Sequence, residues 1–175
     1  MDRATDRATD RATVEIRRAT PSDAPGIAVL HAASIRGLAA EHYTPAQIAA
    51  WSDGKEPARY EGALASGEVM FVAVSSDGGI VGFGAYAGDE VRAVYVEPRC
   101  ARCRIGSRLL EAIEAHARAH GRTALHLQAS LNAVPFYAAR GYDEGDRGRH
   151  PIRHGEVLEC VHMTKTMHAS TEPVP

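Results

Sequence analysis

The amino-acid sequence predicts a mixed α+β domain built around one central sheet. Within residues 69–96, three runs of strand-forming residues follow one another with only short glycine-containing gaps, and strands this close in sequence usually pair as antiparallel neighbours. Segments with the helical spacing of apolar residues precede this run, and helices alternate with further strands after it. This order of elements is typical of helices packed on a single mixed sheet.

The N-terminal third of the domain predicts one strand and three helices. Residues 14–17 alternate between apolar and polar side chains and indicate a strand that ends before Pro21. Three helices are expected after it, each marked by a capping residue or by a proline at its start. These start signals are Ser22 or Asp23, Thr44 followed by Pro45, and Pro57.

The middle of the chain predicts a β-hairpin and one further strand. Residues 69–75 and 80–86 flank the turn sequence Asp77-Gly78-Gly79, and residues 90–96 form the third run. A glycine turn between two such runs is a strong short-range signal for a hairpin.

The C-terminal part begins with the helix of strongest amphipathic pattern. Residues 106–120 carry Leu109, Ile113 and Ala117 on one face, and Gly121 ends the helix. The remaining elements are a strand over residues 124–129, a helix that Asn132 caps and that runs to Gly141, and closing strands over residues 142–146 and 157–165.

The folded domain is expected to span residues 14–165. Residues 1–13 contain three copies of Asp-Arg-Ala-Thr, a period with no useful apolar face, so they predict a disordered leader, with a short charged helix as the alternative. Residues 166–175 are polar and contain proline, which predicts a disordered tail. We expect one domain without an internal linker.

Composition excludes several classes of protein. The formal net charge is −2, which gives no general attraction to nucleic acid. The longest uninterrupted apolar run, residues 69–74, is far shorter than the about 20 residues of a membrane helix. Three cysteines and the absence of an apolar N-terminal signal segment predict a cytoplasmic protein without a disulfide framework.

The segment 97–108 concentrates positive charge where a helix starts. It contains four arginines, Arg99, Arg102, Arg104 and Arg108, against the single carboxylate of Glu97. Free backbone N–H groups and the helix dipole at such a position favour a phosphate group. The segment therefore indicates a pyrophosphate site, and a solvated basic turn is the alternative.

The same segment resembles motif A of the GNAT superfamily, the acyl-CoA-dependent N-acetyltransferases. Val96-Glu97-Pro98 and residues 105–110 (IGSRLL) fit its strand, loop and helix start. Residues 130–142 (SLNAVPFYAARGY) are similar to motif B of that family, at the expected spacing. The segments that resemble other parts of the family are residues 14–28, 43–51 and 82–84.

The resemblance implies a fold and a cosubstrate. It implies a central mixed, mostly antiparallel sheet of about seven strands, splayed after the fourth strand and flanked by about four helices. It also implies acetyl-CoA as cosubstrate and no metal. The residues expected to contact acetyl-CoA are Val94, Tyr95, Val96, Arg102, Cys103, Arg104, Ile105, Gly106, Ser107, Asn132 and Tyr137.

The loop departs from the family pattern at two positions. Ala101 stands where the family has Gln or Arg, and Arg104 stands where it has the first glycine. A side chain is unfavourable there if the position needs a positive φ or a close approach of phosphate. We expect acetyl-CoA binding to be retained because Gly106 and the helix start are intact.

Two residues are candidates for catalysis by their motif positions. Tyr137 corresponds to the general acid that protonates the CoA thiolate, and the alternative is a core residue of an amphipathic helix. Glu90 resembles the glutamate that some members use as a base, and the alternative is an exposed carboxylate at a strand end. The backbone N–H of Val94 or of a neighbour would polarise the thioester carbonyl.

Other chemically suggestive residues receive structural interpretations. Cys100 and Cys103 form a CxxC without a second pair, which disfavours a metal or redox site. Cys160 lacks an identifiable base, so direct transfer is preferred to an acyl-enzyme. The histidines expected to pack structurally are His116 and His120 near a helix end and His126 on a strand.

The expected acceptor is a small-molecule amine. The pocket for it is predicted to lie between the first two helices and the last hairpin, near Ser34, Arg36, His42, Tyr43, Trp51 and Tyr86. Packing of a short helix is the alternative role for Tyr43 and Trp51, and the lack of an acidic cluster disfavours polyamines. Acetylation of a protein or peptide and a non-catalytic acyl-CoA sensor remain as alternatives, and homodimerisation is common in the family.

Overall fold

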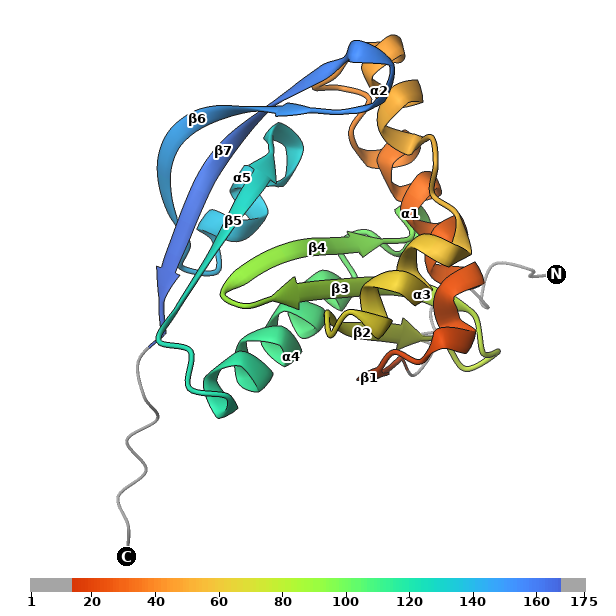
Figure 1. Cartoon of the computed structure of the whole chain (residues 1–175), viewed down its shortest axis with the longest axis vertical. Coiled ribbons are helices and arrows are strands. Elements are labelled where there is room, and N and C mark those ends of the chain that lie inside the picture. The colour runs from red at the N-terminus through yellow and green to blue at the C-terminus, as the bar shows by residue number, and fades with distance from the viewer. Residues whose placement is uncertain (1–13, 168–175) are drawn as a thin grey trace, which may run out of the picture.

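The computed structural model describes residues 14–167 (Figure 1). The leader predicted over residues 1–13 lies outside the described residues, as does all of the predicted tail after Met167. The folded part extends two residues past the expected boundary, because Thr166 still belongs to the last strand and Met167 is buried, with its backbone N–H donating to the carbonyl of Thr123 at 2.7 Å.

The fold is one seven-stranded sheet with helices on both faces, as predicted. The strands are β1 (Glu15–Arg18), β2 (Val69–Val74), β3 (Ile80–Ala87), β4 (Glu90–Val96), β5 (Ala124–Ser130), β6 (Asp143–Pro151) and β7 (Val157–Thr166). The helices are α1 (Ala24–Leu38), α2 (Pro45–Ser52), α3 (Pro57–Ala65), α4 (Ile105–Ala119) and α5 (Val134–Ala138). The strand order is β1-β2-β3-β4-β5-β7-β6.

The sheet is splayed in its middle. All neighbouring strands pair antiparallel except β4 and β5, which run parallel and pair at only two positions, Glu90 with His126 and Val91 with Leu127. Beyond Val91 the two strands diverge, and Figure 1 shows β5, β6 and β7 turned away from the first four strands. The predicted splay after the fourth strand is therefore confirmed.

Two apolar clusters fix the helices on the first half of the sheet. On one face, Leu109, Ile113 and Ala117 of α4 are fully buried against the sheet. A Cβ at Gly82 of β3 would lie 2.9 Å from the Ile105 side chain, so this glycine allows the N-terminus of α4 to lie close to the sheet. The other face is covered by α1 and α3. The start of α4 is thus held beside the splay.

The segment around α2 bridges the two halves of the sheet. Thr44 caps α2 as predicted, and its hydroxyl accepts from the Gln47 backbone N–H at 3.2 Å. The Gln47 side chain donates to the Val157 carbonyl at 2.7 Å. The Tyr43 hydroxyl donates to the Glu159 carbonyl at 2.6 Å and accepts from the Leu131 backbone N–H at 2.9 Å. These bonds join the α1–α2 segment to β7 across the splay.

Two predicted elements have different bounds. The helix expected from Asn132 to Gly141 is a 3-10 turn over residues 131–133 followed by α5, which is short and has Ala133 at its N-cap, so Asn132 does not cap it. Pro135 in the first turn of α5 explains the later start. The strand expected over residues 142–146 is longer, because most residues of β6 are charged or polar and carry little apolar signal.

Within residues 14–167, no helix has both the length and the apolar character that crossing a membrane requires.

Candidate active site

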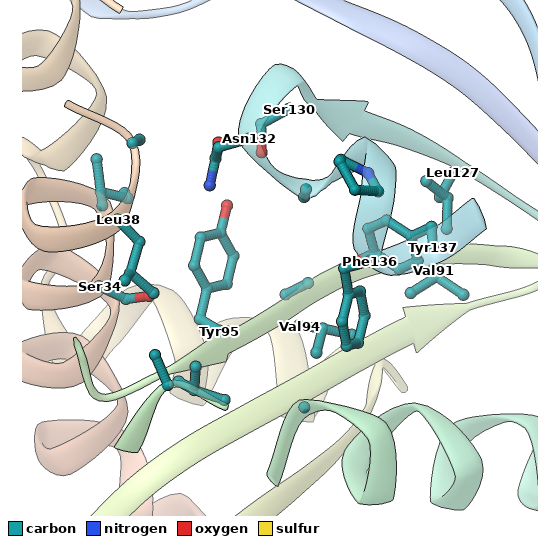
Figure 2. A pocket seen from close by; sticks show the side chains of 18 of the residues that line it. Ser34, Leu38, Val91, Val94, Tyr95, Leu127, Ser130, Asn132, Phe136 and Tyr137 are labelled. Carbon is teal, nitrogen blue, oxygen red and sulfur yellow. The ribbon is translucent and has the colours of Figure 1, made fainter. Parts of the chain in front are cut away.

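A cavity of about 550 Å³ opens where β4 and β5 separate. Most of its walls come from β4, the end of β5, α5 with the turn before it, and the C-terminal half of α1 (Figure 2), and the remainder comes from α2 and the loop before α4. The labelled lining residues are Ser34, Leu38, Val91, Val94, Tyr95, Leu127, Ser130, Asn132, Phe136 and Tyr137. The predicted position of the acetyl-CoA arm coincides with this cavity.

One long wall of the cavity is the free edge of β4. No strand of the described chain pairs with this edge after Val91, whereas residues 93–96 pair with β3 on the other edge. Val94, Tyr95 and Val96 all line the cavity. Their backbone groups on this side need hydrogen-bond partners, and an extended ligand with amide groups can supply them as an added strand would.

A β-bulge lies at the narrow end of the splay. Tyr86 pairs with Val91 and Ala85 pairs with Ala93, so that Arg92 is an extra residue in β4. A bulge leaves backbone groups unpaired and re-aims the strand, and such irregularities are common next to active sites. The Arg92 side chain donates to Glu90 Oε2 at 3.2 Å and to Glu68 Oε2 at 3.2 Å.

The loop before α4 closes one end of the cavity. Ala101, Arg102 and Gly106 line it. Arg102 and Arg104 adopt left-handed backbone conformations, with φ of 69° and 62°, so the position that holds Arg104 does require a positive φ. These turns aim the start of α4 toward the cavity, where free N–H groups and the helix dipole favour an anion.

The predicted cosubstrate contacts divide into two sets. The residues that line the cavity are Val94, Tyr95, Val96, Arg102, Gly106, Asn132 and Tyr137. Cys103, Arg104, Ile105 and Ser107 belong to the adjacent turn and do not line it. The Ile105 side chain is buried in the α4 core cluster, and Ser107 Oγ accepts from Arg140 Nε at 3.1 Å. The side chains of Ile105 and Ser107 are therefore engaged within the protein, and only their backbone groups are candidates for contact with a ligand.

Tyr137 reaches the cavity from α5. Its side chain is 7% exposed, and it packs edge-to-face on Phe136 and near Tyr142. Burial raises the pKa of the phenol above its usual range. Tyr137 is therefore protonated throughout the neutral pH range, as a proton donor must be.

Asn132 lines the cavity and carries a buried polar atom without a partner in the described part of the chain. Its Oδ1 is buried and has no hydrogen-bond partner among residues 14–167. Figure 2 shows the Asn132 side chain and the Tyr95 hydroxyl pointing toward each other across the cavity. An orphaned acceptor beside a free strand edge is what a bound amide-containing arm would satisfy, so the residues present fit the pantetheine part of acetyl-CoA.

A second pocket of about 320 Å³ adjoins the first. Both are lined by Trp51, Val91, Arg92, Tyr95, Gln128 and Ser130. Glu90 lines only the second pocket, on the side of the bulge. The predicted base and the predicted acid thus lie in adjoining pockets that share β4 as a wall.

The predicted acceptor residues are only partly brought together. Ser34 and Trp51 line the first pocket, and Tyr43 and Trp51 line the second. Tyr43 and Trp51 also pack edge-to-face, with ring centroids 5.5 Å apart, so their packing role is real as well.

Three of the acceptor predictions are wrong. Arg36 donates to Ser52 Oγ at 3.2 Å, and His42 is exposed away from both pockets. Tyr86 lies on the α4 face, with its hydroxyl 2.6 Å from His116 Nδ1.

Sequence reasoning missed several polar residues of the second pocket. Among them are Arg59, Gln128, Ser130 and His150. They come from α3, β5 and β6, and no motif joins them, because only the splay and the α2 segment bring these elements together. The alternation of β5 is the one sequence signal that could have placed Gln128 and Ser130 on a common face.

The histidines and cysteine that were given structural roles show no catalytic or metal-binding arrangement among residues 14–167. His116 is partly buried near the end of α4, as expected, whereas His120 is exposed and stacks on His116 with the ring centroids 4.1 Å apart. The expectation of a packed His126 is wrong, because its side chain is 48% exposed and lies 3.3 Å from Asp89 Oδ1. Cys160 is buried in the second pocket, and burial raises the pKa of its thiol, which disfavours a thiolate. Among residues 14–167, no cluster of His, Cys, Asp and Glu could hold a metal.

Comparison with known proteins identifies the class of this fold and site. A family model described as acetyltransferase (GNAT) domain matches residues 39–167. The chain belongs to the GNAT superfamily and is an N-acetyltransferase. The resemblance seen in the sequence is confirmed.

Individual relatives agree with this assignment. A GCN5-related N-acetyltransferase from Rhodopseudomonas palustris is 34% identical, with a TM-score of 0.80, and the match covers 89% of this chain and 97% of that one. An IAA acetyltransferase from Azospirillum brasilense is 36% identical over 94 residues, which are 49% of this chain and 60% of that protein. This chain therefore spans less than two thirds of that relative.

Solved structures with bound cosubstrate share the fold. The PaiA N-acetyltransferase of Thermoplasma acidophilum, in complex with coenzyme A, is 20% identical and has a TM-score of 0.71, covering 88% of this chain and 99% of that one. An acetyltransferase of Salmonella typhimurium with acetyl-CoA is 18% identical and has a TM-score of 0.66, covering 93% of this chain and 99% of that one. At these identities the likeness concerns the fold alone.

Proposed function

We propose that this enzyme transfers the acetyl group of acetyl-CoA directly to the primary amine of a small molecule. The observation that carries the proposal is the pair of adjoining pockets that share the bulged part of β4. One pocket has the free strand edge and helix start that suit a long phosphorylated arm. The other is small and holds a carboxylate, which suits an amine acceptor.

The residues of the first pocket would bind acetyl-CoA, which supplies an acetyl thioester when bound. The free edge of Val94, Tyr95 and Val96 would pair with its amide groups, and Asn132 Oδ1 would accept a hydrogen bond from it. The backbone N–H groups of residues 102–107 would receive its pyrophosphate at the start of α4. Four arginines in residues 97–108 favour the same negative charge.

Glu90 and Tyr137 would carry the proton transfers. Arg92 occupies Glu90 Oε2, and Oε1 can accept the proton that the acceptor nitrogen loses when it forms the new C–N bond. A backbone N–H at the bulge or at Val94 would donate to the thioester carbonyl oxygen as its negative charge grows. Tyr137 would donate its proton to the sulfur as the C–S bond breaks. The apolar cavity that raises the pKa of Tyr137 would raise that of a thiol in the same way, which keeps the two groups matched.

The small-molecule acceptor is favoured by hydrogen bonds that cross between the two halves of the sheet beside the second pocket. The bonds from Tyr43 to Glu159 and Leu131, and from Gln47 to Val157, cross from the α1–α2 segment to the second half of the sheet. His154 Nε2 also lies 2.8 Å from Asp53 Oδ2. A peptide would need an open groove on this side, which these contacts span.

The assignment of Tyr137 is tested by a pair of tyrosine variants. With a panel of primary amines and release of free thiol as the readout, Tyr137→Phe should lower kcat by about 100-fold, because the acid is lost. CoA affinity, measured by calorimetry, should stay unchanged. Tyr142→Phe is the matched control, because the Tyr142 hydroxyl is buried without a hydrogen-bond partner in residues 14–167, and its kcat should equal that of the wild type.

Other outcomes point to the alternatives. Full activity of Tyr137→Phe would show that another group is the acid. Turnover of peptides but of no small amine would favour the protein acetyltransferase. Tight binding of CoA without turnover of any amine or peptide would favour the acyl-CoA sensor.

A further inference from the structure

The second pocket contains an arginine that no carboxylate of residues 14–167 pairs with. Its lining includes two arginines, Arg59 and Arg92, and two glutamates, Glu90 and Glu159. Glu90 is paired with Arg92, which also pairs with Glu68 outside the pocket. Glu159 alternates with the buried Leu158 and Cys160 along β7, so its side chain points to the opposite face of the strand. Arg59 is then a pocket cation without a compensating carboxylate.

A second unpaired cation lies next to Arg59. In the described part of the chain, neither Arg59 nor Lys55 takes part in an ion pair. Burial, together with the nearby charges of Arg59 and Arg153, lowers the pKa of Lys55 to about 8. The positive charges of Lys55 and Arg59 also act on the buried His31. Arg59 lines the pocket and Lys55 does not; the two like charges repel one another, and an anion bound at Arg59 would relieve this repulsion.

We propose that the acceptor is a small amine that also bears a carboxylate, which Arg59 binds while the amine faces Glu90. This inference rests on the proposed function and names the substrate class of the same site. A guanidinium donates two parallel hydrogen bonds to a carboxylate, a match that an ammonium lacks. The two charged groups of such an acceptor are complementary to two lining residues of the pocket, Arg59 on α3 and Glu90 on β4.

The rest of the pocket suits the apolar part of such a molecule. The rings of Trp51 and Tyr95 are shared with the first pocket, with centroids 6.4 Å apart, and Tyr43 adds a third ring. Polyamines are disfavoured, because their second ammonium group would lie against Arg59. The acceptor class is therefore an apolar or aromatic amino acid, rather than an amine with several positive charges.

The test compares sets of amines that differ in the carboxylate. Phenylalanine, phenylalaninamide and 2-phenylethylamine form one set, and leucine, leucinamide and isoamylamine form another. Arg59→Gln should raise KM for the carboxylate-bearing member by about 10-fold or more, because a charge-assisted bidentate contact is lost. It should leave KM for the amide and the decarboxylated amine within about twofold. Removal of a carboxylate also changes the pKa of the amine. The diagnostic quantity is therefore the KM of the variant divided by the KM of the wild type, taken for each amine separately.

Arg149→Gln is the matched control. Arg149 lies on β6 opposite Glu159, lines neither pocket, and carries the same charge, so all its ratios should be close to one. Thermal unfolding and CoA titration of Arg59→Gln should match the wild type, which separates a local effect from a loss of fold.

The outcomes distinguish the inference from the proposed function. Equal changes for all three members of a set, or a wild-type preference for the amide or the decarboxylated amine, would overturn the inference and leave the proposed function standing. Release of no thiol with any amine of the panel would contradict the proposed function, and the inference with it.

Discussion

Arg104 illustrates a residue whose identity conflicts with its backbone conformation. It is the N-cap of α4 and has φ of 62° and ψ of 8°. A side chain with a Cβ is strained in this region, whereas glycine is not. The sequence predicted the conflict, because the family pattern has a glycine where this chain has Arg104. The strain itself is visible only in the backbone angles.

Replacement of Arg104 should therefore stabilise the protein. Arg104→Gly is expected to raise the free energy of unfolding by about 1 kcal/mol, measured by urea denaturation. Arg99→Gly is the control, because it removes the same charge from the same loop, and Arg99 has no positive φ; it should be neutral or destabilising by about 0.5–1 kcal/mol. Equal shifts for the two variants would show that charge, and not backbone strain, dominates.

At the scale of elements, the site depends on how closely α4 approaches α5. A Cβ at Gly106 would lie 3.2 Å from Cε2 of Phe136. The Phe136 ring is itself held under the Arg140 guanidinium, at 4.0 Å from its centroid, and Arg140 donates to Ser107 at the start of α4. This group of contacts fixes α5, and with it Tyr137, relative to the helix start.

Gly106→Ala should therefore disturb both the fold and the cavity. The ring of Phe136 must move by a few tenths of an ångström, which should lower the free energy of unfolding by about 1–2 kcal/mol and weaken CoA binding. Phe136→Leu provides the double-mutant cycle, because a smaller side chain leaves room for the new methyl group. Strictly additive effects of the two substitutions on stability would mean that the two positions do not interact.

Periodicity and capping signals were sufficient to predict most helices and strands. They were not sufficient where an element or a side chain depends on tertiary contacts. The capping box of Thr44 and Gln47 and the apolar face of α4 act locally, so the sequence predicted both. Most residues of β6 are exposed and charged, so its length depends on pairing with β7, which is a tertiary effect. Asn132 resembles a helix cap, but its side chain instead lines the cavity.

At the scale of the whole molecule, the splay determines the candidate site. The order of the strands places β5 beside β4 and β7 beside β5, and periodicity contains no information about this order. The family resemblance implied the splay after the fourth strand, and with it the expected contacts of Val94 and Asn132 with acetyl-CoA. The resemblance could not supply Arg59, because α3 reaches the second pocket only through the packing of α1, α2 and α3 on this face. The acceptor side of the site was therefore the least predictable part.

His31 links the pH dependence of the whole fold to a single core residue. It is 7% exposed on α1, its ring centroid lies 4.0 Å from that of Tyr95, and its Nδ1 shares a hydrogen bond of 2.9 Å with the Tyr60 hydroxyl. Its Nε2 is buried without a partner among residues 14–167. Burial, reinforced by the positive charges of Lys55 and Arg59, holds the pKa of His31 well below its ordinary 6.5.

The protein should therefore lose stability as the pH falls below about 6.5. In that range the unfolded chain binds a proton at His31 that the folded protein does not bind, so the free energy of unfolding should fall by about 1.4 kcal/mol per pH unit from this group. Above pH 6.5 both states are neutral at His31, and its contribution is constant.

Urea denaturation between pH 5 and 7 measures the slope. His31→Phe keeps a ring in the core and should reduce the slope by that amount, whereas His42→Phe, at an exposed position, should leave it unchanged. An unchanged slope in His31→Phe would contradict this prediction. It would mean that the folded domain can bind the proton at His31 through local opening, without global unfolding.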